Sequence, residues 1–227
     1  MEYKEFEKIL LDLFPEVDEQ QKSRYEALDA LYTDWNSKIN VISRKDIGGL
    51  YPHHVLHSLA IASYLKDMKP EVYEQFREGG LKVLDLGTGG GFPGVPLAIM
   101  FPKTQFTLCD SVGKKTIVAS GVSEALKLDN VKVVNARAES LPETFDYVVS
   151  RAVTSLDNFY PWVKGKFTKD ILYLKGGEIN EEIAEVMGRY HLPKGSVATW
   201  PLYRGWLPAY ACLDEWFDQK FVIDIKA

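Results

Sequence analysis

The sequence has few cysteines and no apolar run long enough to cross a membrane. Its 227 residues include two cysteines, Cys109 and Cys212, and the chain shows no pattern of a secretory signal. This scarcity favours the reducing cytosol and gives little support to a disulfide between the two. Glycine, proline or charge interrupts each apolar stretch well before the roughly 20 residues that a membrane helix needs. We expect a soluble, cytoplasmic protein without a membrane partner.

The sequence also lacks an excess of positive charge. Its net charge is −5 and its pI is about 5.5. The whole molecule therefore does not produce the field of a protein that coats nucleic acid, so a polyanionic partner must meet a local basic patch. The sequence contains no internal repeat and no low-complexity segment, which argues against a solenoid. With 46% hydrophobic residues, the chain can bury the core of one large domain or of a domain with a helical extension.

The first part of the chain has the spacing of amphipathic helices. Apolar residues recur at helical intervals over residues 3–14, 22–39 and 50–65, and Pro15 ends the first of these patterns. The second pattern is rich in aromatic side chains, which need a packing partner. We assign residues 1–78 to an N-terminal helical extension.

After Gly79 and Gly80, short apolar runs alternate with helical stretches. Strands are expected at 82–86, 105–109, 131–134, 147–150 and 171–174, with helices at 95–101, 114–128, 156–163 and 180–190. This alternation predicts an α/β fold, with a mostly parallel sheet that carries helices on both faces. The last runs, 197–202 and 220–225, predict an antiparallel pair at the sheet edge. We assign residues 79–227 to this second domain.

A glycine-rich loop follows the first predicted strand. It reads Asp85-Leu-Gly87-Thr-Gly89-Gly-Gly91-Phe92-Pro93-Gly94. Ligands of doubly wound sheets bind beyond the carboxyl ends of the strands. Glycines allow positive φ and close backbone approach, and proline suits the first turn of a helix. The loop is shaped for close contact with a ligand, although a tight strand-to-helix turn alone would also need glycines.

Two cofactors fit this loop. Residues 89–94 satisfy the dinucleotide fingerprint G-x-G-x-x-G, and Asp110 follows about twenty residues later, where a ribose-binding acid belongs. The loop is better described as Asp85-x-Gly87-x-Gly89-x-Gly91, which resembles the first motif of class I S-adenosylmethionine (AdoMet) methyltransferases. Asp110 would accept ribose hydroxyls in either case. A hydride-transfer enzyme also needs a group that polarises a carbonyl, and we find none, so AdoMet is favoured.

Further motifs resemble the RsmG (GidB) family of bacterial 16S rRNA guanine-N7 methyltransferases. The resemblance covers most of the chain. It includes the glycine loop, the segments 34–41 (DWNSKINV), 110–115 (DSVGKK) and 137–139 (RAE), the triplet 150–152 (SRA), and the region around His54 and Ser58. At His57 the family often has an aspartate.

The resemblance implies a Rossmann-like AdoMet domain after N-terminal helices, acting on a guanine in the decoding-region loop of 16S rRNA, within the small ribosomal subunit. By matching motif, the AdoMet contacts would be Gly87, Phe92, Ala138, Glu139 and Arg151. To these we add Gly89 and Asp110 from the general class I pattern. Guanine N7 has a free lone pair, so we expect catalysis by positioning and no catalytic base.

Contacts to RNA should come from local cations and exposed rings. The candidates are Arg151, Lys114, Lys115 and Lys175, with Lys164, Lys166 and Lys169 as further cations near element ends, and Phe92, Tyr147 and Trp162 to stack on a base. His53 and His57 have the i, i+4 spacing of a zinc clamp, but no nearby residue completes a ligand set, and we expect no metal.

The sequence leaves alternative functions and residue roles open. A methyltransferase of a small molecule and a non-catalytic module that senses a nucleotide both keep the ligand loop. Trp35 and Asn40 could shape the site or tie the helical part to the sheet. The aromatic tail, Trp200, Trp206, Trp216 and Phe217, is expected to pack in the core and at the sheet edge.

Overall fold

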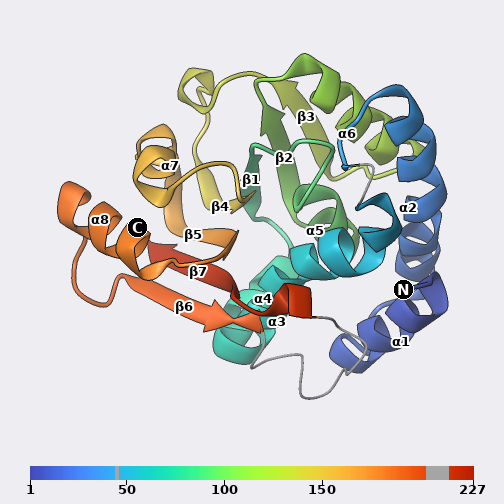
Figure 1. Cartoon of the computed structure of the whole chain (residues 1–227), viewed down its shortest axis with the longest axis horizontal. Coiled ribbons are helices and arrows are strands. Elements are labelled where there is room, and N and C mark those ends of the chain that lie inside the picture. The colour runs from blue at the N-terminus through green and yellow to red at the C-terminus, as the bar shows by residue number, and fades with distance from the viewer. Residues whose placement is uncertain (44–45, 203–214) are drawn as a thin grey trace.

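A seven-stranded sheet in the order β3-β2-β1-β4-β5-β7-β6 forms the centre of the protein (Figure 1). The computed structural model describes residues 1–43, 46–202 and 215–227. Its strands are β1 (Lys82–Leu86), β2 (Gln105–Asp110), β3 (Val131–Asn135), β4 (Phe145–Arg151), β5 (Phe167–Gly176), β6 (Val197–Pro201) and β7 (Lys220–Lys226). Strands β1 to β5 are parallel, whereas β7 runs antiparallel to both β5 and β6. The predicted α/β class and its antiparallel edge pair are confirmed.

Helices precede the sheet and connect its strands. The α-helices are α1 (Tyr3–Leu13), α2 (Glu19–Lys38), α3 (His57–Met68), α4 (Pro70–Glu78), α5 (Gly94–Met100), α6 (Gly113–Ala125), α7 (Leu156–Val163) and α8 (Asn180–Tyr190). The short helices are η1 (Ile47–Gly49), η2 (Leu50–Leu56), η3 (Ala138–Ser140) and η4 (Glu215–Phe217). The helix predicted at 50–65 begins instead as a π-helix, η2, because apolar spacing does not reveal a widened turn. Helix α4 was not predicted, although Pro70 stands at its first turn.

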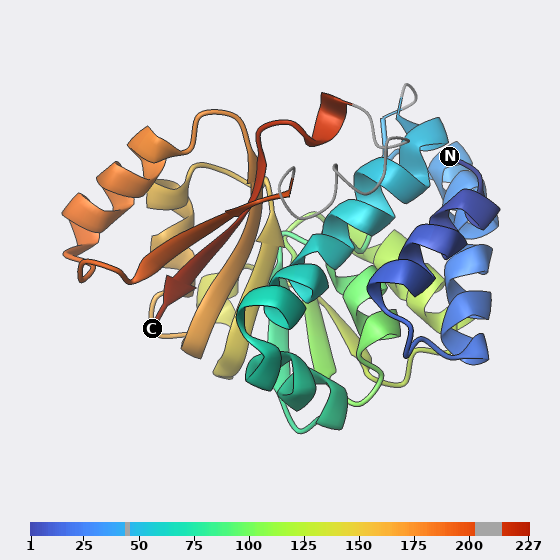
Figure 2. The same cartoon turned by 90° about the horizontal axis from the view of Figure 1, so that it is seen from below.

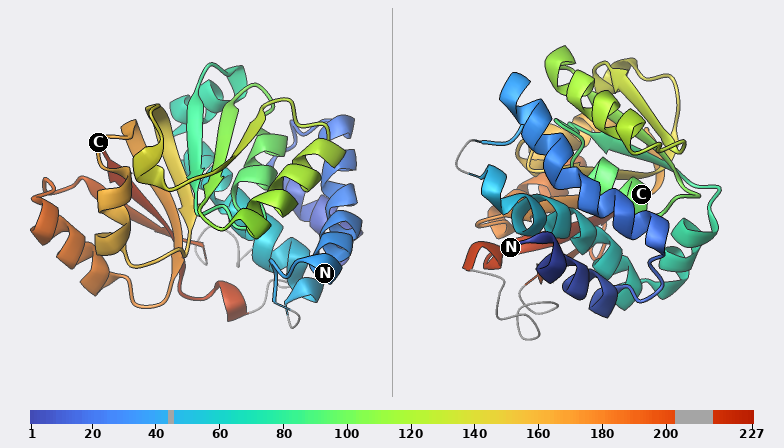
Figure 3. Two further views of the ribbon diagram at one scale, coloured as in Figure 1. Left: turned by 90° about the horizontal axis from the view of Figure 1, so that it is seen from above. Right: turned by 90° about the vertical axis from the view of Figure 1, so that its right-hand side faces the viewer.

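The sheet separates two hydrophobic clusters. Helices α7 and α8 cover one face, and α1 to α6 lie against the other, as Figures 2 and 3 show. Adjacent residues of β1 take part in different clusters, since Val83 faces the helical side and Leu84 the side of α7. Buried side chains of α1 to α4 join the same cluster as one face of the sheet, and the division at residues 78 and 79 stays a prediction.

The order of the strands reverses beside β1. The chain runs outward from β1 to β2 and β3, and then returns to place β4 on the other side of β1. Connections therefore leave the carboxyl ends of β1 and β4 in opposite directions, which opens a crevice between them. The sheet differs from the all-parallel dinucleotide-binding sheet because antiparallel β7 lies between β5 and β6.

Several isolated residues take structural roles. Cys109 is a buried free thiol whose pKa burial raises to about 11, as expected for an inert cysteine. Trp200 and Phe217 are buried in the core, and Trp216 is half-buried against Phe217, whereas Trp206 and Cys212 lie outside the described residues. No helix in the described part of the chain is both long and apolar enough to span a membrane.

Trp35 of α2 fastens the helical part to the sheet through Gly121 of α6. A Cβ atom on Gly121 would lie 2.1 Å from Cζ2 of Trp35, so the glycine permits the close approach of these two helices. This contact favours the role of Trp35 in tying the helical part to the sheet over a role in shaping the site. Asn40, by contrast, is exposed at the end of the same segment.

We expect Gly121→Ala to lower the free energy of unfolding by about 1–3 kcal/mol, because the added methyl group overpacks the contact with Trp35. The measurement is the urea midpoint of unfolding. Gly188→Ala on α8 is the matched control, since a Cβ there meets nothing within 4 Å. The control should keep or raise stability through helix propensity. An equal effect of the two substitutions would contradict this packing role.

Candidate functional site

A cavity of about 570 Å³ opens at the carboxyl ends of the central strands. Its walls come from the ends of β1, β2 and β4, the loop after β3 and helix α7. The lining residues are Leu86, Gly87, Asp110, Ser111, Val112, Lys115, Ala136, Arg137, Ala138, Glu139, Arg151, Ala152, Val153 and Trp162. The volume lies within the range of small-molecule and cofactor sites. The cavity is therefore the candidate site.

The glycine loop forms one wall and folds back over the end of β2. Gly87 has φ of 73°, and its N–H donates to the carbonyl of Cys109 at 2.8 Å. A Cβ atom on Gly87 would lie only 2.3 Å from Cγ2 of Val153 and would clash with it. The positive φ would also strain the backbone of any residue other than glycine. Gly89 has φ of 58° and donates its N–H to Oδ2 of Asp110 at 3.0 Å. The loop is thus tied to the acid that ends β2.

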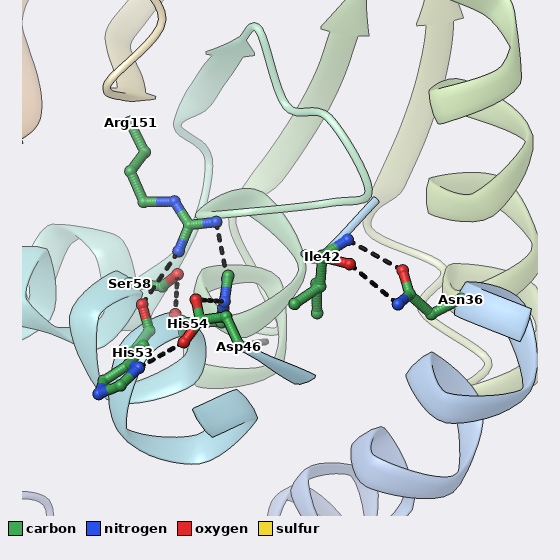
Figure 4. A network of polar contacts seen from close by, with 7 residues as sticks. All are labelled: Asn36, Ile42, Asp46, His53, His54, Ser58 and Arg151. Carbon is green, nitrogen blue, oxygen red and sulfur yellow. Dashed lines mark hydrogen bonds and ion pairs between the residues drawn. The ribbon is translucent and has the colours of Figure 1, made fainter. Parts of the chain in front are cut away.

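Helix α2 and the segment after it hold the loop from behind. The Tyr32 hydroxyl donates to the carbonyl of Gly90 at 2.9 Å, and the Tyr32 ring stacks on Phe92 with centroids 4.7 Å apart. The Asn36 amide binds the backbone N–H and the carbonyl of Ile42, each at 2.9 Å (Figure 4). Val41, next to Ile42, packs so close to Gly90 that a Cβ there would lie 2.7 Å from its Cγ2 atom. The N-terminal helices therefore shape the site.

Asp85 lies beneath the loop and does not line the cavity. Its Oδ2 atom accepts hydrogen bonds from the Thr88 hydroxyl at 2.5 Å and from the Gly94 N–H at 2.8 Å. Its Oδ1 atom has no hydrogen-bond partner among the described residues. Burial raises the pKa of Asp85 to about 7, although the bonds to Thr88 and Gly94 and the charge of Arg151 act the other way. Asp85, next to the last residue of β1, thus holds the loop together at an electrostatic cost.

The next wall offers acceptors and donors suited to a nucleoside. Asp110 lines the cavity and accepts N–H groups from Gly89 and Val112, yet its carboxylate keeps lone pairs for further donors such as a ribose diol. Ala138 and Glu139 begin helix η3, and the first N–H groups of a helix have no partner within it. Ala138 is buried, whereas Glu139 is exposed. Both line the cavity.

Arg151 ends β4 and lines the same cavity. Its guanidinium donates to the carbonyl of His53 at 3.3 Å and to Nδ1 of His54 at 3.1 Å (Figure 4). Its central carbon lies 5.0 Å from the centroid of the Phe92 ring. Burial lowers the pKa of Arg151 to about 10, with the charge of Asp85 acting against this. The side chain is therefore a cation at physiological pH.

The structure brings most of the predicted cofactor residues to the cavity and places two behind it. Gly87, Asp110, Ala138, Glu139 and Arg151 line it. Gly89 and Phe92 do not line the cavity, since Gly89 lies beside Asp110 and buried Phe92 packs under Arg151.

The predicted RNA-contacting residues fall in different places. Lys115 lines the cavity, and exposed Lys114 precedes it on the first turn of α6. Lys175 is paired with Glu182 at 2.7 Å and donates to the carbonyl of Thr154 at 2.9 Å, so its charge is already compensated.

Of the remaining lysines and aromatic residues predicted to contact RNA, some lie at the cavity and others lie away from it. Lys166 and Lys169 lie near the start of β5, at the amino ends of the parallel strands and away from the cavity at their carboxyl ends, and Lys164 lies near the end of α7. Trp162 lines the cavity, whereas Tyr147 is buried and packs against Phe76.

The histidines surround an acid that sequence reasoning passed over. Asp46 accepts from Nδ1 of His53 at 2.6 Å and Nε2 of His54 at 2.8 Å, while buried His57 packs edge-on against Trp216 and Phe217. Among residues 1–43, 46–202 and 215–227, no group of three His, Cys, Asp or Glu side chains is arranged to hold a metal ion. The sequence patterns gave no site role to Tyr32 or Asp46 and included Asn36 only within the segment 34–41, because the folding of the chain decides which partners these side chains meet.

Two solved structures with a similar fold carry the names of methyltransferases. The magnesium protoporphyrin IX methyltransferase of Synechocystis, solved with bound SAM, has a TM-score of 0.57 at 13% identity, covering 93% of this chain and 99% of that one. The ribosomal protein L11 methylase of Lactobacillus delbrueckii has a TM-score of 0.52 at 11% identity and covers 74% of this chain and 75% of that one. These likenesses show the class I AdoMet methyltransferase fold.

Other relatives are far more similar to this chain in sequence than the solved structures are. The profile of the GidB family, rRNA small subunit methyltransferase G, matches residues 21–203. The ribosomal RNA small subunit methyltransferase G of Flavobacterium psychrophilum is 50% identical over 184 residues, which cover 78% of this chain and 83% of that protein. Its namesake from Bacteroides fragilis is 51% identical over 183 residues, which cover 77% of this chain and 84% of that protein. The chain therefore belongs to the rRNA small subunit methyltransferase G family.

Proposed function

We propose that this chain transfers a methyl group from AdoMet to N7 of a guanine in the decoding-region loop of 16S rRNA, within the small ribosomal subunit and in the cytoplasm. One observation carries the proposal. In a member of this family, Gly87, Asp110, Ala138, Glu139 and Arg151 line a single cavity at the point where the strand order reverses. Relatives about half identical in sequence carry the name of a ribosomal RNA methyltransferase, which supports the same substrate.

The residues present fit AdoMet. Asp110 can accept the ribose hydroxyls, and the start of η3 at Ala138 and Glu139 can meet the adenine. Gly87 and Arg151, at the ends of β1 and β4, remain for the amino-acid half. The unpaired Oδ1 atom of buried Asp85 favours a positively charged ligand above the loop. When bound, AdoMet supplies an electrophilic methyl group on a positively charged sulfur.

The chain contributes positioning. Guanine N7 is neutral and has a free lone pair, so no side chain has to remove a proton before transfer. Holding the reacting atoms in line accounts for about 7–11 kcal/mol of the barrier in well-oriented reactions. A free cation beside N7 would oppose the charge that develops there, and Arg151 is instead fixed against Phe92, His53 and His54.

The rim of the cavity suits a base that has left its stack. Val112 and Val153 are exposed apolar side chains that line the cavity, together with Trp162. A purine needs such apolar surface when it is swung out of RNA. Lys115 stands at the same rim and exposed Lys114 precedes it on α6, where phosphates that flank the base would pass.

The test of the proposed reaction is methyl transfer from labelled AdoMet to small subunits from a strain that lacks this gene. After digestion, the label should appear in 7-methylguanosine. Gly87→Ala should abolish most of the transfer, because its Cβ would meet Val153. Gly177→Ala is the control, since its φ is also positive, at 89°, but a Cβ meets nothing within 4 Å.

Other outcomes of this experiment are informative. Label on naked 16S rRNA and not on subunits would reject the assembled subunit as substrate. Label on a metabolite or a protein would reject the RNA reaction while leaving the cofactor site standing.

The affinity for AdoMet should rise between about pH 6 and 8, because Asp85 has a pKa of about 7 and its ionised form attracts a cation. Isothermal titration calorimetry across this range measures the slope, which Asp85→Asn should flatten. Without ligand, the folded chain binds a proton that the unfolded chain releases near pH 4, so this group's contribution to stability falls as pH rises from about 4 to about 7. Asp34→Asn, on an exposed pair with Lys38, is the control. An unchanged slope in Asp85→Asn would refute this role.

Lys115→Ala should weaken binding of the RNA substrate and reduce the slope of log K against log salt by about 1, because one phosphate contact is lost. Filter binding at several salt concentrations gives this slope. Lys132→Ala is the matched control, since Lys132 is an exposed lysine on β3 paired with Glu143, away from the cavity. Equal slopes for the two variants would remove Lys115 from the RNA contact.

A further inference from the structure

The side chain of Arg151 lines the cavity, but the residues that hold it in place lie outside the cavity. Its NH1 group donates to the carbonyl of His53, its NH2 group donates to Nδ1 of His54, and its guanidinium lies over the Phe92 ring. An arginine has five N–H donors, so these contacts leave donors for a ligand. The two histidines do not line the cavity. His54 packs against Phe92 behind the cavity, and both histidines bind Arg151, which lines it.

The orientation of His54 is fixed by Asp46. Nε2 of His54 lies 2.8 Å from Oδ2 of Asp46, and a guanidinium can only donate. Nδ1 must therefore accept from Arg151, and Nε2 must carry the proton that faces Asp46. Burial, with the nearby charge of Arg151, lowers the pKa of His54 to about 4. The imidazole is thus neutral and keeps its acceptor at physiological pH.

Asp46 in turn is fixed at both oxygens. Figure 4 shows Asp46 bound to both histidines, and its second oxygen, Oδ1, lies 2.6 Å from Nδ1 of His53. Both histidines belong to the π-helix η2. A Cβ atom on Gly49 would lie 2.5 Å from Nδ1 of His53 and 2.9 Å from Oδ1 of Asp46, so the preceding turn allows this approach only with a glycine. Three elements, the η1 turn, η2 and β4, thereby converge on one guanidinium.

The strand order indicates what this guanidinium meets. The nucleoside contacts proposed above lie at the ends of β3 and β2, with Asp110 and Ala138, so the amino-acid half of the donor extends toward β1 and β4. The end of β4 is Arg151, and a planar guanidinium matches a carboxylate with two parallel hydrogen bonds. This step depends on AdoMet being the donor, as proposed above.

We propose that Asp46 and His54 are positioning residues, which aim Arg151 at the carboxylate of the methyl donor and so set the affinity for its amino-acid half.

The test compares two ligands that share a 5′-thioadenosine group and differ in the substituent on sulfur. S-adenosylhomocysteine carries the carboxylate, whereas 5′-methylthioadenosine lacks the amino-acid group. Calorimetry on the full chain should show His54→Leu and Asp46→Asn binding S-adenosylhomocysteine at least about tenfold more weakly, the effect of losing a hydrogen bond to a charged group. Binding of 5′-methylthioadenosine should change less than about twofold. A merely structural defect would weaken both ligands.

Three further variants sharpen the result. His54→Asn places a side-chain oxygen near the position of Nδ1 and should recover part of the lost affinity, because Arg151 regains an acceptor. In an Arg151→Met background, His54→Leu should have no further effect on S-adenosylhomocysteine, since its action passes through Arg151. Asp34→Asn is the control for Asp46→Asn and should bind both ligands like the parent chain. Thermal unfolding of each variant shows that it is folded.

Several results would overturn the proposal. Equal losses for both ligands would make His54 and Asp46 structural, and an additive loss in the Arg151→Met background would separate His54 from Arg151. If the parent chain binds both ligands but His54→Leu does not distinguish them, the positioning role fails while the proposed donor stands. If the parent chain binds neither ligand, the donor is wrong and the positioning role falls with it.

Discussion

The buried carboxylate of Asp85 is the contact on which the site depends. It joins the end of β1 to Thr88 and to Gly94 at the start of α5, and so closes the glycine loop around one charge. A carboxylate with an unpaired oxygen in the core costs stability, and its raised pKa of about 7 records that cost. Buried ionisable groups with strongly shifted pKa values cluster at functional sites. The negative charge that would attract a cationic ligand is therefore in place before the ligand binds.

The N-terminal helices complete the site as well as the core. Tyr32 and Val41 press on Gly90 from behind, while Asp46 and His54 hold Arg151 on the other side of the loop. The contacts of Tyr32, Val41 and His54 join the N-terminal part to a loop or strand end far away in the sequence, whereas Asp46 acts locally on His54. A chain without these helices would leave the glycine loop and Arg151 without their supports. The extension is therefore part of the site's geometry, although the domain division itself stays a prediction.

Local sequence patterns predicted the elements well where packing agreed with them. The strand positions, the helices between them and the antiparallel edge pair follow from periodicity and turn residues, because a strand buried on both faces must be short and apolar. The π-helix η2 was predicted as an ordinary helix. Apolar spacing does not distinguish i, i+4 from i, i+5 bonding, because both leave apolar side chains on one face of the helix.

The sequence by itself determined the class of sheet, the place of the glycine loop and the acid that follows β2, since each rests on residue types at fixed spacing. Only the tertiary structure decided which predicted residues share a cavity. It placed Phe92 under Arg151, took Lys175 into an ion pair with Glu182, and turned Asp46 toward two histidines. The reason is physical. Which side chains meet depends on how the chain turns between elements and on how strands are ordered and helices packed, even for partners as near in sequence as Asp46 and His54. A pattern of residue types along the chain carries no record of that arrangement.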